Sequence, residues 1–513
     1  MLDRAAELRP WDVVVVGGGC TGLATALDAA ARGYRTLLLE RGDFAGGTSS
    51  RSTKLVHGGV RYLRQGEVGL VYGALRERHR LLWNAPHLVH DLALIVPAYR
   101  WWERAWFGTG LKLYDALARG RSLGPSRLLS RRDCLNRIST LSDRGLRGGV
   151  LFHDGQFDDA RLGWAMLRTA VSLGGVALNY AEVTGLVESR GAVKGVRVRD
   201  RLGGTEWEVR GAVVVNAAGP FADSIRRMDE PDRNPAVVLS RGAHIVVSSA
   251  FLPGRSAVLV PRTDDGRVLF AIPWHGHVVI GTTDVPVDEP SREPVPTGAE
   301  VDYLIEHAGR YLTRPITRPD ILSAWAGLRG LTAAGAEQNT AALSRGHSVG
   351  ASRQGLVTVT GGKWTTCRKV AQDTVNVAAD VGGLSPAHTR TATLRLHGYS
   401  RRGDARYPWK VYGTDADAIR ELEKADERLS ALMHPSLPYR LSQAAWAARS
   451  EMAVCLEDVL ARRTRALFLN ARAAMVAAPA VAAVMARELG RDDRWIADEV
   501  RAFKRLANRY LCG

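Results

Sequence analysis

The chain has 513 residues, which is too long for one compact core and predicts two or three domains. Apolar residues make up 46% and charged residues 24%, a balance typical of a soluble globular protein. The net charge of +17 suits a nucleic acid, an anionic lipid or a phosphorylated small molecule as partner, although genome bias toward arginine also produces such an excess.

The sequence pattern argues against export and membrane insertion. No apolar run reaches the roughly 18 residues that span a bilayer, and residues 1–10 lack the apolar segment of a secretory signal. Five cysteines are scattered without CxxC pairs, which predicts a reduced cytoplasmic protein with neither a disulfide framework nor a metal site. They are Cys20, Cys134, Cys367, Cys455 and Cys512.

A dinucleotide site is predicted near the start of the chain. Residues 12–16 form a β-branched run typical of a buried parallel strand, and a second strand is expected over 35–39. An Ala-rich helical pattern lies between them and begins with G-x-G-x-x-G, which brings a helix N-terminus to a diphosphate. Glu40 can accept hydrogen bonds from both ribose hydroxyls, which favours FAD or NAD over NADP. The three glycines are Gly17, Gly19 and Gly22.

The segment after the second strand favours FAD. Residues 46–59 are rich in glycine and hydroxyl side chains, where an NAD domain would normally continue into a helix. Bare N–H groups and hydroxyls at this place can surround a diphosphate and a flavin. A flexible surface loop would not explain why these residues concentrate directly after a dinucleotide half-site.

The rest of the chain changes character twice. Further buried strands are expected over 213–215 and 357–360, and alternating strands between about 236 and 317 predict an antiparallel layer inserted into the α/β chain. Residues 398–408 are polar and typical of a linker. Residues 413–513 have a helical pattern rich in Ala, Arg and Leu.

Several motifs recur in one order along the chain. The longest is S-S-R-S-T-K-L-V-H-G-G-V-R-Y-L over 49–63. The others are D-D-A-R-L over 158–162, V-N-A-A-G-P over 215–220, H-I-V-V over 244–247, I-G-T-T-D over 280–284, G-G-K-W-T-T over 361–366 and L-E-D-V-L-A-R-R-T-R over 456–465. Together they resemble the FAD-dependent glycerol-3-phosphate dehydrogenases, which belong to the D-amino-acid-oxidase-like flavoproteins. The resemblance covers about residues 12–505.

The resemblance implies an α/β fold in three parts. A Rossmann-like FAD-binding domain is expected to be discontinuous over 1–95, 148–235 and 318–395. An inserted antiparallel β-sheet substrate domain, or cap, is expected over 96–147 and 236–317. A C-terminal helical domain is expected over 409–513.

The implied reaction is oxidation of sn-glycerol 3-phosphate to dihydroxyacetone phosphate by hydride transfer to FAD. The substrate is dianionic, so its site should present cations, and the planar fork of arginine meets phosphate oxygens in pairs. By resemblance the substrate-binding residues are Arg61, Tyr62, Arg329, Arg345 and Lys363.

A base must accept the hydroxyl proton, and histidine is the usual choice because it titrates near neutral pH. His57 and His244 are the candidates by motif, with cofactor contact left open for His57 and phosphate binding left open for His244. The implied catalytic set is His57, His244, Arg329 and Lys363.

The implied FAD site draws on several segments. Lys363 precedes a helix expected near Thr365, whose N-terminus would stabilise negative charge on the reduced cofactor. The expected cofactor-binding residues are Gly17, Gly19, Gly22, Glu40, Thr48, Ser49, Ser50, Thr53, Lys54, Leu55, His57, Gly58, Gly59, Val183, Ala218, Gly219, Gly362, Lys363 and Thr365.

Three positions depart from the family pattern. Residues 327–331 are G-L-R-G-L where the family has G-x-R-P-L, and residues 344–346 are S-R-G where it has Ser-Arg-acid. Cys367 stands where a tyrosine is common. These changes leave the cations in place and bear on the shape of the pocket around them.

Members of this family usually pass electrons to a membrane quinone, whereas an oxidase branch carries an extra insertion that we do not find before Arg329. Residues 99–114 interleave aromatic side chains with cations, and residues 100–147 hold 11 Lys and Arg against 4 Asp and Glu. Such a segment suits an amphipathic helix on an anionic membrane surface, although a basic helix packed on its own domain is the alternative. We therefore expect a cytoplasmic protein held peripherally at the inner face of the membrane.

Two other functions stay open at this point. One is an FAD-dependent oxidase of another small hydroxy or amino acid, whose carboxylate one or two arginines could bind. The other is an RNA-binding flavin-fold protein, suggested by the net charge. The motifs favour a phosphorylated substrate, so we expect no nucleic-acid partner. We also expect no metal. A homodimer is left open.

Overall fold

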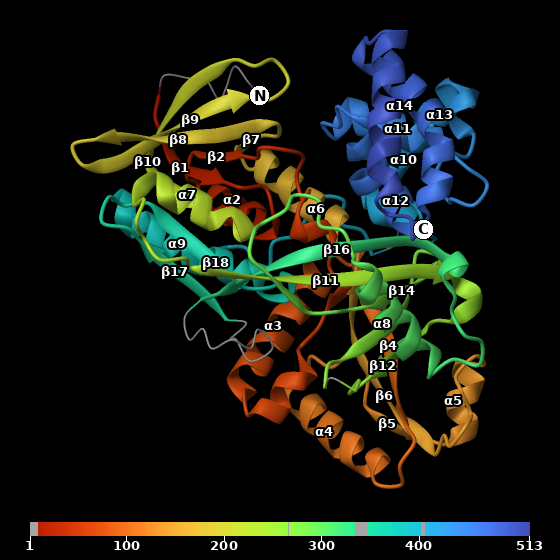
Figure 1. The fold of residues 1–513 in the computed structure, drawn as a ribbon. Coiled ribbons are helices and arrows are strands. Elements are labelled where there is room, and N and C mark those ends of the chain that lie inside the picture. The colour runs from red at the N-terminus through yellow and green to blue at the C-terminus, as the bar shows by residue number, and fades with distance from the viewer. Residues whose placement is uncertain (1–8, 119, 265, 334–345, 402–405, 513) are drawn as a thin grey trace.

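The computed structural model describes residues 9–118, 120–264, 266–333, 346–401 and 406–512. These residues form two sheets and a helical domain that follows them in the chain (Figure 1). The α/β fold class expected from the sequence, with an FAD-binding part, an antiparallel sheet and a C-terminal helical domain, is confirmed.

The first sheet is built around the N-terminal strand. Its order is β17-β18-β10-β1-β2-β7, parallel throughout except for β17, and an antiparallel ribbon of β8 and β9 continues from β10. The strands are β1 (Trp11–Val16), β2 (Thr36–Leu39), β7 (Val176–Leu178), β8 (Ala181–Ser189), β9 (Ala192–Asp200), β10 (Glu206–Asn216), β17 (His347–Ala351) and β18 (Val357–Gly361).

Both faces of this sheet are covered. Val13 and Val15 of β1 pack with the helices α2, α6 and α9, whereas Val14 and Val16 pack with the β8–β9 ribbon. Successive side chains of a strand point to opposite faces, so a continuous valine run is what a doubly covered strand requires. The three helices are α2 (Cys20–Ala31), α6 (Asp159–Ser172) and α9 (Cys367–Gly382).

The second sheet has the order β15-β11-β14-β13-β12-β4-β6-β3, with β16 beside β11 and β5 beside β6. Its pairs are antiparallel except for β12 with β4. The strands are β3 (Leu55–Val56), β4 (Val89–Ala98), β5 (Arg127–Leu129), β6 (Gly148–Phe157), β11 (Val237–Ser248), β12 (Ser256–Val260), β13 (Leu269–Trp274), β14 (His277–Gly281), β15 (Val285–Val287) and β16 (Ile321–Thr332).

Helices accompany the second sheet, and α4 lies at its lower end in Figure 1. They are α3 (Val68–Asn84), α4 (Glu103–Ala118), α5 (Arg131–Arg137) and α8 (Gly298–Gly309), and α7 (Ala222–Asp229) follows β10. Strands β3, β6 and β16 fall within 1–95, 148–235 and 318–395, the ranges expected for the FAD-binding domain, yet they pair within the second sheet. The domain boundaries therefore remain a proposal.

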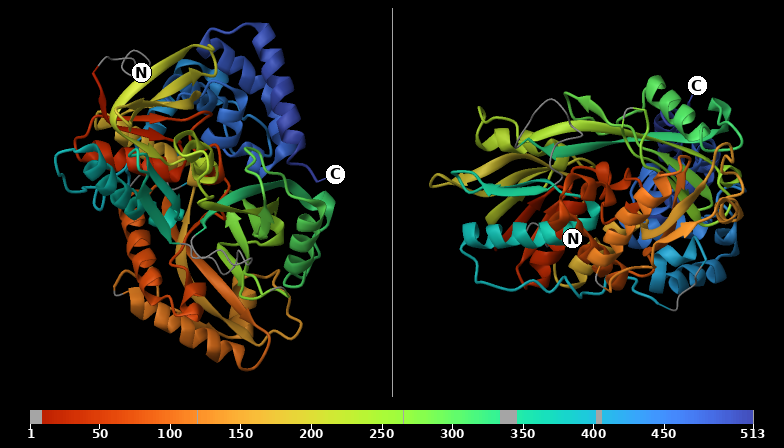
Figure 2. Two further views of the ribbon diagram at one scale, coloured as in Figure 1. Left: turned by 60° about the vertical axis from the view of Figure 1, so that its left-hand side comes forward. Right: turned by 90° about the horizontal axis from the view of Figure 1, so that it is seen from below.

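The C-terminal helices share a core with the second sheet, because Trp274 of β13 and Trp325 of β16 are buried among their apolar side chains. This domain stands beside both sheets (Figure 2). It consists of α10 (Ala416–Ala425), α11 (Leu441–Ser450), the π-helical turn η9 (Asp458–Arg463), α12 (Ala466–Leu469), α13 (Ala471–Leu489) and α14 (Asp493–Asn508).

Candidate functional site

A cavity of about 830 Å³ opens where β1, β2 and β18 end. The carboxyl ends of parallel strands are the usual place for a ligand in an open α/β sheet. Residues of β11 and β16 in the second sheet line the same cavity, as do Glu457 and Arg462 of the helical domain. All three parts of the chain therefore meet at this site.

The turn from β1 into α2 leaves no room for side chains. Gly17 has φ +107°, and a Cβ at Gly22 would lie 1.8 Å from the Gly17 carbonyl oxygen. Helix α2 begins after Gly19, which has no side chain to cap it, and no acidic residue lies in its first turn. The Cys20 N–H donates to Ser49 Oγ at 2.8 Å. A helix N-terminus favours an anion, which fits the diphosphate of a dinucleotide.

Glu40 lines the cavity directly after β2. Its carboxylate accepts hydrogen bonds from the backbone N–H groups of Gly18 at 2.6 Å and Gly42 at 2.8 Å. Burial raises the pKa of Glu40, and the two N–H groups oppose this shift. A carboxylate fixed in this way suits a ribose hydroxyl, and Val183 of β8 lines the cavity with it.

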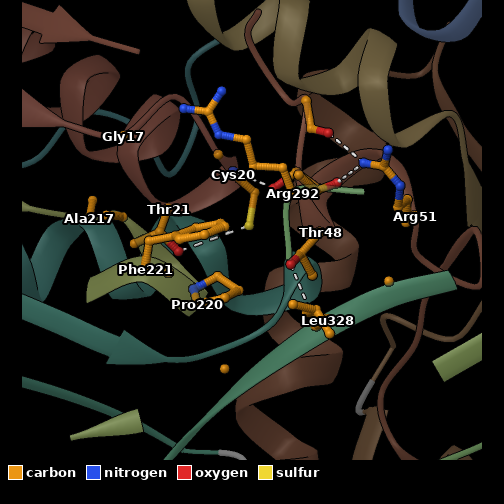
Figure 3. A pocket seen from close by; sticks show the side chains of 18 of the residues that line it. Gly17, Cys20, Thr21, Thr48, Arg51, Ala217, Pro220, Phe221, Arg292 and Leu328 are labelled. Atoms are coloured by element: carbon orange, nitrogen blue, oxygen red, sulfur yellow. Dashed lines mark hydrogen bonds between the residues drawn. The ribbon is translucent and has the colours of Figure 1, made fainter. Parts of the chain in front are cut away.

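The loop after β2 is tied to the rest of the site by hydrogen bonds. Thr48 Oγ1 donates to the Leu328 carbonyl of β16 (Figure 3). Trp364 Nε1 donates to the Ser49 carbonyl at 3.0 Å, and Thr365 Oγ1 donates to the His57 carbonyl at 3.2 Å. These bonds join the loop to the segments on which the expected flavin-binding residues lie.

His244 is buried at the edge of the cavity, where its Nε2 lies 3.0 Å from Thr53 Oγ1. Its ring stacks on Trp325 with the centroids 4.2 Å apart. Burial lowers the pKa of His244 well below 6.5, and the charges of Lys54 and Arg329 lower it further. The imidazole is therefore neutral at pH 7.

Arg329 and Lys363 bring cations to the same cavity. The guanidinium of Arg329 donates to Thr282 Oγ1 at 3.0 Å and lies 3.2 Å from Asp284 Oδ1. Lys363 Nζ lies 4.9 Å from the centroid of the Tyr62 ring. Two cations, a neutral histidine and a phenol thus line one space, which suits a small phosphorylated alcohol.

The cavity brings together most of the residues expected from the sequence. Those lining it are Gly17, Gly19, Glu40, Thr48, Ser49, Thr53, Leu55, His57, Tyr62, Val183, Ala218, Gly219, His244, Arg329, Gly362, Lys363 and Thr365. Gly22, Ser50, Lys54, Gly58 and Gly59 do not line it. The side chain of Arg61 and the whole of Arg345 lie outside the described residues.

Lys54 points away from the cavity and into the protein. Its Nζ lies 2.6 Å from Asp159 Oδ2 and donates to the Ser50 carbonyl at 2.7 Å, and neither charged side chain is exposed. Burial lowers the pKa of Lys54 to about 7, against the opposing charge of Asp159. Arg465 of the helical domain also donates to the Ser50 carbonyl, at 2.6 Å. Lys54 therefore anchors the cofactor loop rather than touching the cavity.

A second buried charge cluster joins the FAD-binding part to the helical domain. Arg463 Nη2 donates to Asp43 Oδ1 at 2.9 Å, and Arg462 pairs with both Asp43 and Asp458. Burial alone raises the pKa of Asp43, but Arg463 and Arg462 outweigh it and lower the pKa to about 2. This cluster fixes η9 against the cofactor site.

Several lining residues were not found from the sequence. The cavity is also lined by Arg51, Phe221, Arg292 and Arg462. Phe221, Arg292 and Arg462 lie outside the dinucleotide-binding motifs. Arg51 lies inside the motif over 49–63, but nothing there distinguished its side chain from a solvated one. Arg462 lies in a helical segment whose charges resemble an exposed face, so only the packing of the domains shows its role.

An exposed aromatic patch lies at the start of α4. Trp101, Trp102 and Trp106 are 84%, 41% and 63% exposed. Helix α4 spans Glu103–Ala118, so Trp101 and Trp102 precede it and Trp106 lies in its first turn. Among the described residues, no helix is long and apolar enough to cross a membrane.

Comparison with protein families yields two matches that together cover nearly the whole chain. A model described as FAD dependent oxidoreductase matches residues 12–368. A model described as the C-terminal domain of alpha-glycerophosphate oxidase matches residues 358–495.

Individual relatives agree with these matches. The mitochondrial glycerol-3-phosphate dehydrogenase SDP6 of Arabidopsis thaliana is 39% identical over 95% of this chain and 84% of its own. The mitochondrial glycerol-3-phosphate dehydrogenase of Homo sapiens is 37% identical over 94% of this chain and 71% of its own. The crystal structure of a Bacillus halodurans glycerol-3-phosphate dehydrogenase complexed with FAD has a TM-score of 0.80 at 30% identity, covering 100% of this chain and 97% of that one.

Proposed function

The chain belongs to the FAD-dependent oxidoreductases and, within them, to the glycerol-3-phosphate dehydrogenase family, and from this premise we propose that it oxidises sn-glycerol 3-phosphate to dihydroxyacetone phosphate. The observation that carries the proposal is the convergence of Arg329, Lys363, His57 and His244 on the cavity that also holds the dinucleotide-binding turn. FAD is the cofactor of this family, and the glycines and Glu40 described above fit it.

The phosphate of the substrate is assigned to the cations. Arg329 presents a guanidinium held by Thr282 and Asp284, and Lys363 lies beside Tyr62. An arginine fork pairs with two phosphate oxygens at once, which fixes both the position and the orientation of the group. Arg61 and Arg345 remain proposed partners of the same phosphate.

The proton of the substrate hydroxyl is assigned to a histidine. When bound, FAD supplies an acceptor for the hydride and its two electrons that leave the substrate carbon. The hydroxyl proton must then leave as the carbonyl forms, and His244 or His57 accepts it. The lowered pKa of His244 keeps its ring unprotonated at neutral pH, as this role requires.

A membrane quinone is proposed as the acceptor of the electrons, and an anionic membrane surface as the place where the enzyme meets it. The exposed Trp101, Trp102 and Trp106 support this, because tryptophan rings favour the interfacial region of a bilayer. The cytoplasmic side of the membrane remains an expectation from the sequence.

A second candidate is an FAD-dependent oxidase of another small hydroxy or amino acid. Solved structures of glycine oxidases, with TM-scores near 0.5 and identities of 20%, share the fold alone. Such substrates carry a carboxylate, for which the single fork of Arg329 would suffice.

Anaerobic mixing separates these functions. Purified yellow protein is mixed with glycerol 3-phosphate, glycerol, glycine or lactate, and flavin absorbance is followed. Bleaching by glycerol 3-phosphate alone supports the proposal. Bleaching by an amino or hydroxy acid, with none by glycerol 3-phosphate, would overturn it in favour of the second candidate.

A further inference from the structure

A strap of residues 288–297 crosses one side of the cofactor cavity. It joins β15 of the second sheet to α8 and contains neither helix nor strand. Four consecutive residues of the strap, from Ser291 to Pro294, line the cavity. The strap thus extends from the second sheet to the cavity. The turn from β1 into α2, on the same cavity, belongs to the first sheet.

The strap is held in place through Glu293. Its carboxylate accepts hydrogen bonds from Arg51 Nη2 at 2.5 Å and from Tyr510 Oη at 2.5 Å, and its carbonyl accepts one from Arg509 at 2.7 Å. Arg51 and Tyr510 are both buried. Because Arg51 also donates to the Gly47 carbonyl at 3.0 Å, the strap is fixed relative to the cofactor loop.

This latch sets the position of Arg292. Figure 3 shows the Arg292 side chain extending toward the end of the cavity where Gly17 and Cys20 lie. Burial lowers the pKa of Arg292, and the charge of Glu40 opposes that shift, so the guanidinium lies within the field of the ribose-binding carboxylate. It thus lies on the lining of the cavity that also holds Glu40 and the turn into α2.

The protein itself offers Arg292 only a weak partner in the described part of the chain. Its Nη2 lies 3.5 Å from Glu182 Oε1, and the Arg292 side chain is 42% exposed. An ion pair with this exposure contributes little, on the order of 0–1 kcal/mol. A phosphate oxygen is a better partner, since guanidinium–phosphate pairs form short, charge-assisted hydrogen bonds.

We propose that Arg292 is a cofactor-binding residue that pairs with the diphosphate of FAD from the inserted sheet, while Glu293 latches the strap that carries it. The N-terminus of α2 supplies partial positive charge to one side of the diphosphate, and Arg292 supplies a full charge to the other. Release of FAD then requires the loss of this pair and motion of the strap.

The test measures how fast FAD leaves the holoenzyme. The holoenzyme is diluted into buffer, and the rise of free FAD fluorescence gives the release rate at low and at high salt. Arg292→Ala should release FAD about tenfold faster at low salt, the size expected for one charge-assisted hydrogen bond. The difference in release rate between the parent and Arg292→Ala should shrink at high salt. Arg292→Lys should release FAD at a rate between those of these two proteins. Glu293→Gln should also speed release, although Arg292 is retained.

Arg255→Ala is the matched control, because it removes the same charge from an exposed position of the same sheet region that does not line the cavity. Thermal unfolding in excess FAD, followed by tryptophan fluorescence, checks that each variant is folded. Release from Arg292→Ala at the rate of the parent or of Arg255→Ala would overturn the proposal. Because the readout is FAD itself, the result does not depend on which substrate the enzyme oxidises.

Discussion

Asp284 holds one edge of the Arg329 guanidinium, with its Oδ1 3.2 Å from Nη1. The same carboxylate accepts a hydrogen bond from Ser240, and the other nitrogen of the fork donates to the Thr283 carbonyl at 3.2 Å. The Arg329 side chain nevertheless stays 22% exposed. The guanidinium is therefore oriented by the protein while part of it faces the cavity, as a phosphate-binding group must be.

Arg329→Ala should raise KM for glycerol 3-phosphate steeply and leave the FAD content unchanged. Removing a hydrogen-bonded charge from a binding site costs roughly 2–5 kcal/mol, which corresponds to a rise of about 30-fold or more. Steady-state kinetics with a soluble dye as acceptor measures it. Arg329→Lys keeps the charge but loses the fork, so its KM should lie between those of the parent and Arg329→Ala. Parental KM in the alanine variant would show that the phosphate binds elsewhere.

Asp284→Asn should have a smaller effect of the same kind. The asparagine keeps the shape but loses the charge that orients the fork, so we expect KM to rise about fivefold to tenfold, with little change in kcat. Asp288→Asn, at an exposed position a few residues further on, is the control. A fall in kcat with KM unchanged would contradict a positioning role for Asp284.

His244→Asn tests the assignment of the base. The pKa of His244 lies well below 6.5 because of burial and the charges of Lys54 and Arg329. A base must be unprotonated, so the parental rate should hold through neutral pH and fall only below the usual histidine range. Losing a general base costs about 10²–10⁴ in kcat, and the acidic limb of the pH profile should vanish with it. If His57→Asn removes the limb instead, His57 is the base.

The cofactor half of the site could be predicted because its requirements are local. Gly17, Gly19 and Gly22 are needed within one turn, and Glu40 lies where β2 ends, so spacing along the chain specifies them. The positions of strands could also be predicted. However, β10 extends beyond the expected range 213–215, and β11 extends beyond the motif over 244–247. Pairing with neighbouring strands extends both beyond their most apolar residues.

The charged residues could not be placed in the same way. A sequence rich in arginine predicts solvated faces, yet Arg462, Arg463 and Arg465 are buried. Their partners Asp43 and Asp159 lie more than 300 residues earlier in the chain. No local pattern distinguishes such a pair from a surface charge, so the buried pairing of Lys54 with Asp159 could not be predicted.

Asp159→Asn should destabilise the protein strongly. The carboxylate lies 2.6 Å from Lys54 Nζ and 3.3 Å from Arg465 Nη2. Its loss leaves the buried Arg465 guanidinium without this charge partner and removes the charge that favours the protonated form of Lys54. Breaking a buried ion pair costs about 3–5 kcal/mol. Asp373→Asn is the control, since Asp373 is 29% exposed and pairs with Lys369 on its own helix and with His347 of β17. Both pairs are part-exposed, so the loss of this charge should cost about 1 kcal/mol or less. Urea unfolding compares the two; equal midpoints would contradict the prediction.

Binding to membranes is predicted to depend on the aromatic patch at α4. Trp101 and Trp102 are 84% and 41% exposed, so their rings can enter the interface while nearby cations meet lipid phosphates. Charge alone is screened within about 8 Å at physiological salt, so both contributions are needed. We expect the parent to bind vesicles that contain anionic lipid, more weakly at high salt, and to reduce quinone faster when vesicles are present.

Replacing Trp101 and Trp102 together by Ser should lower binding in vesicle sedimentation, with reduction of a soluble dye unchanged. Trp83→Ser is the control, because Trp83 is 48% exposed on α3 and outside the patch. It should bind vesicles like the parent, which separates the position of the rings from the number of exposed tryptophans. If the double variant also binds like the parent, the patch is not the anchor. The C-terminal domain would then be the next surface to test, because its helix α14 is rich in Arg and Lys.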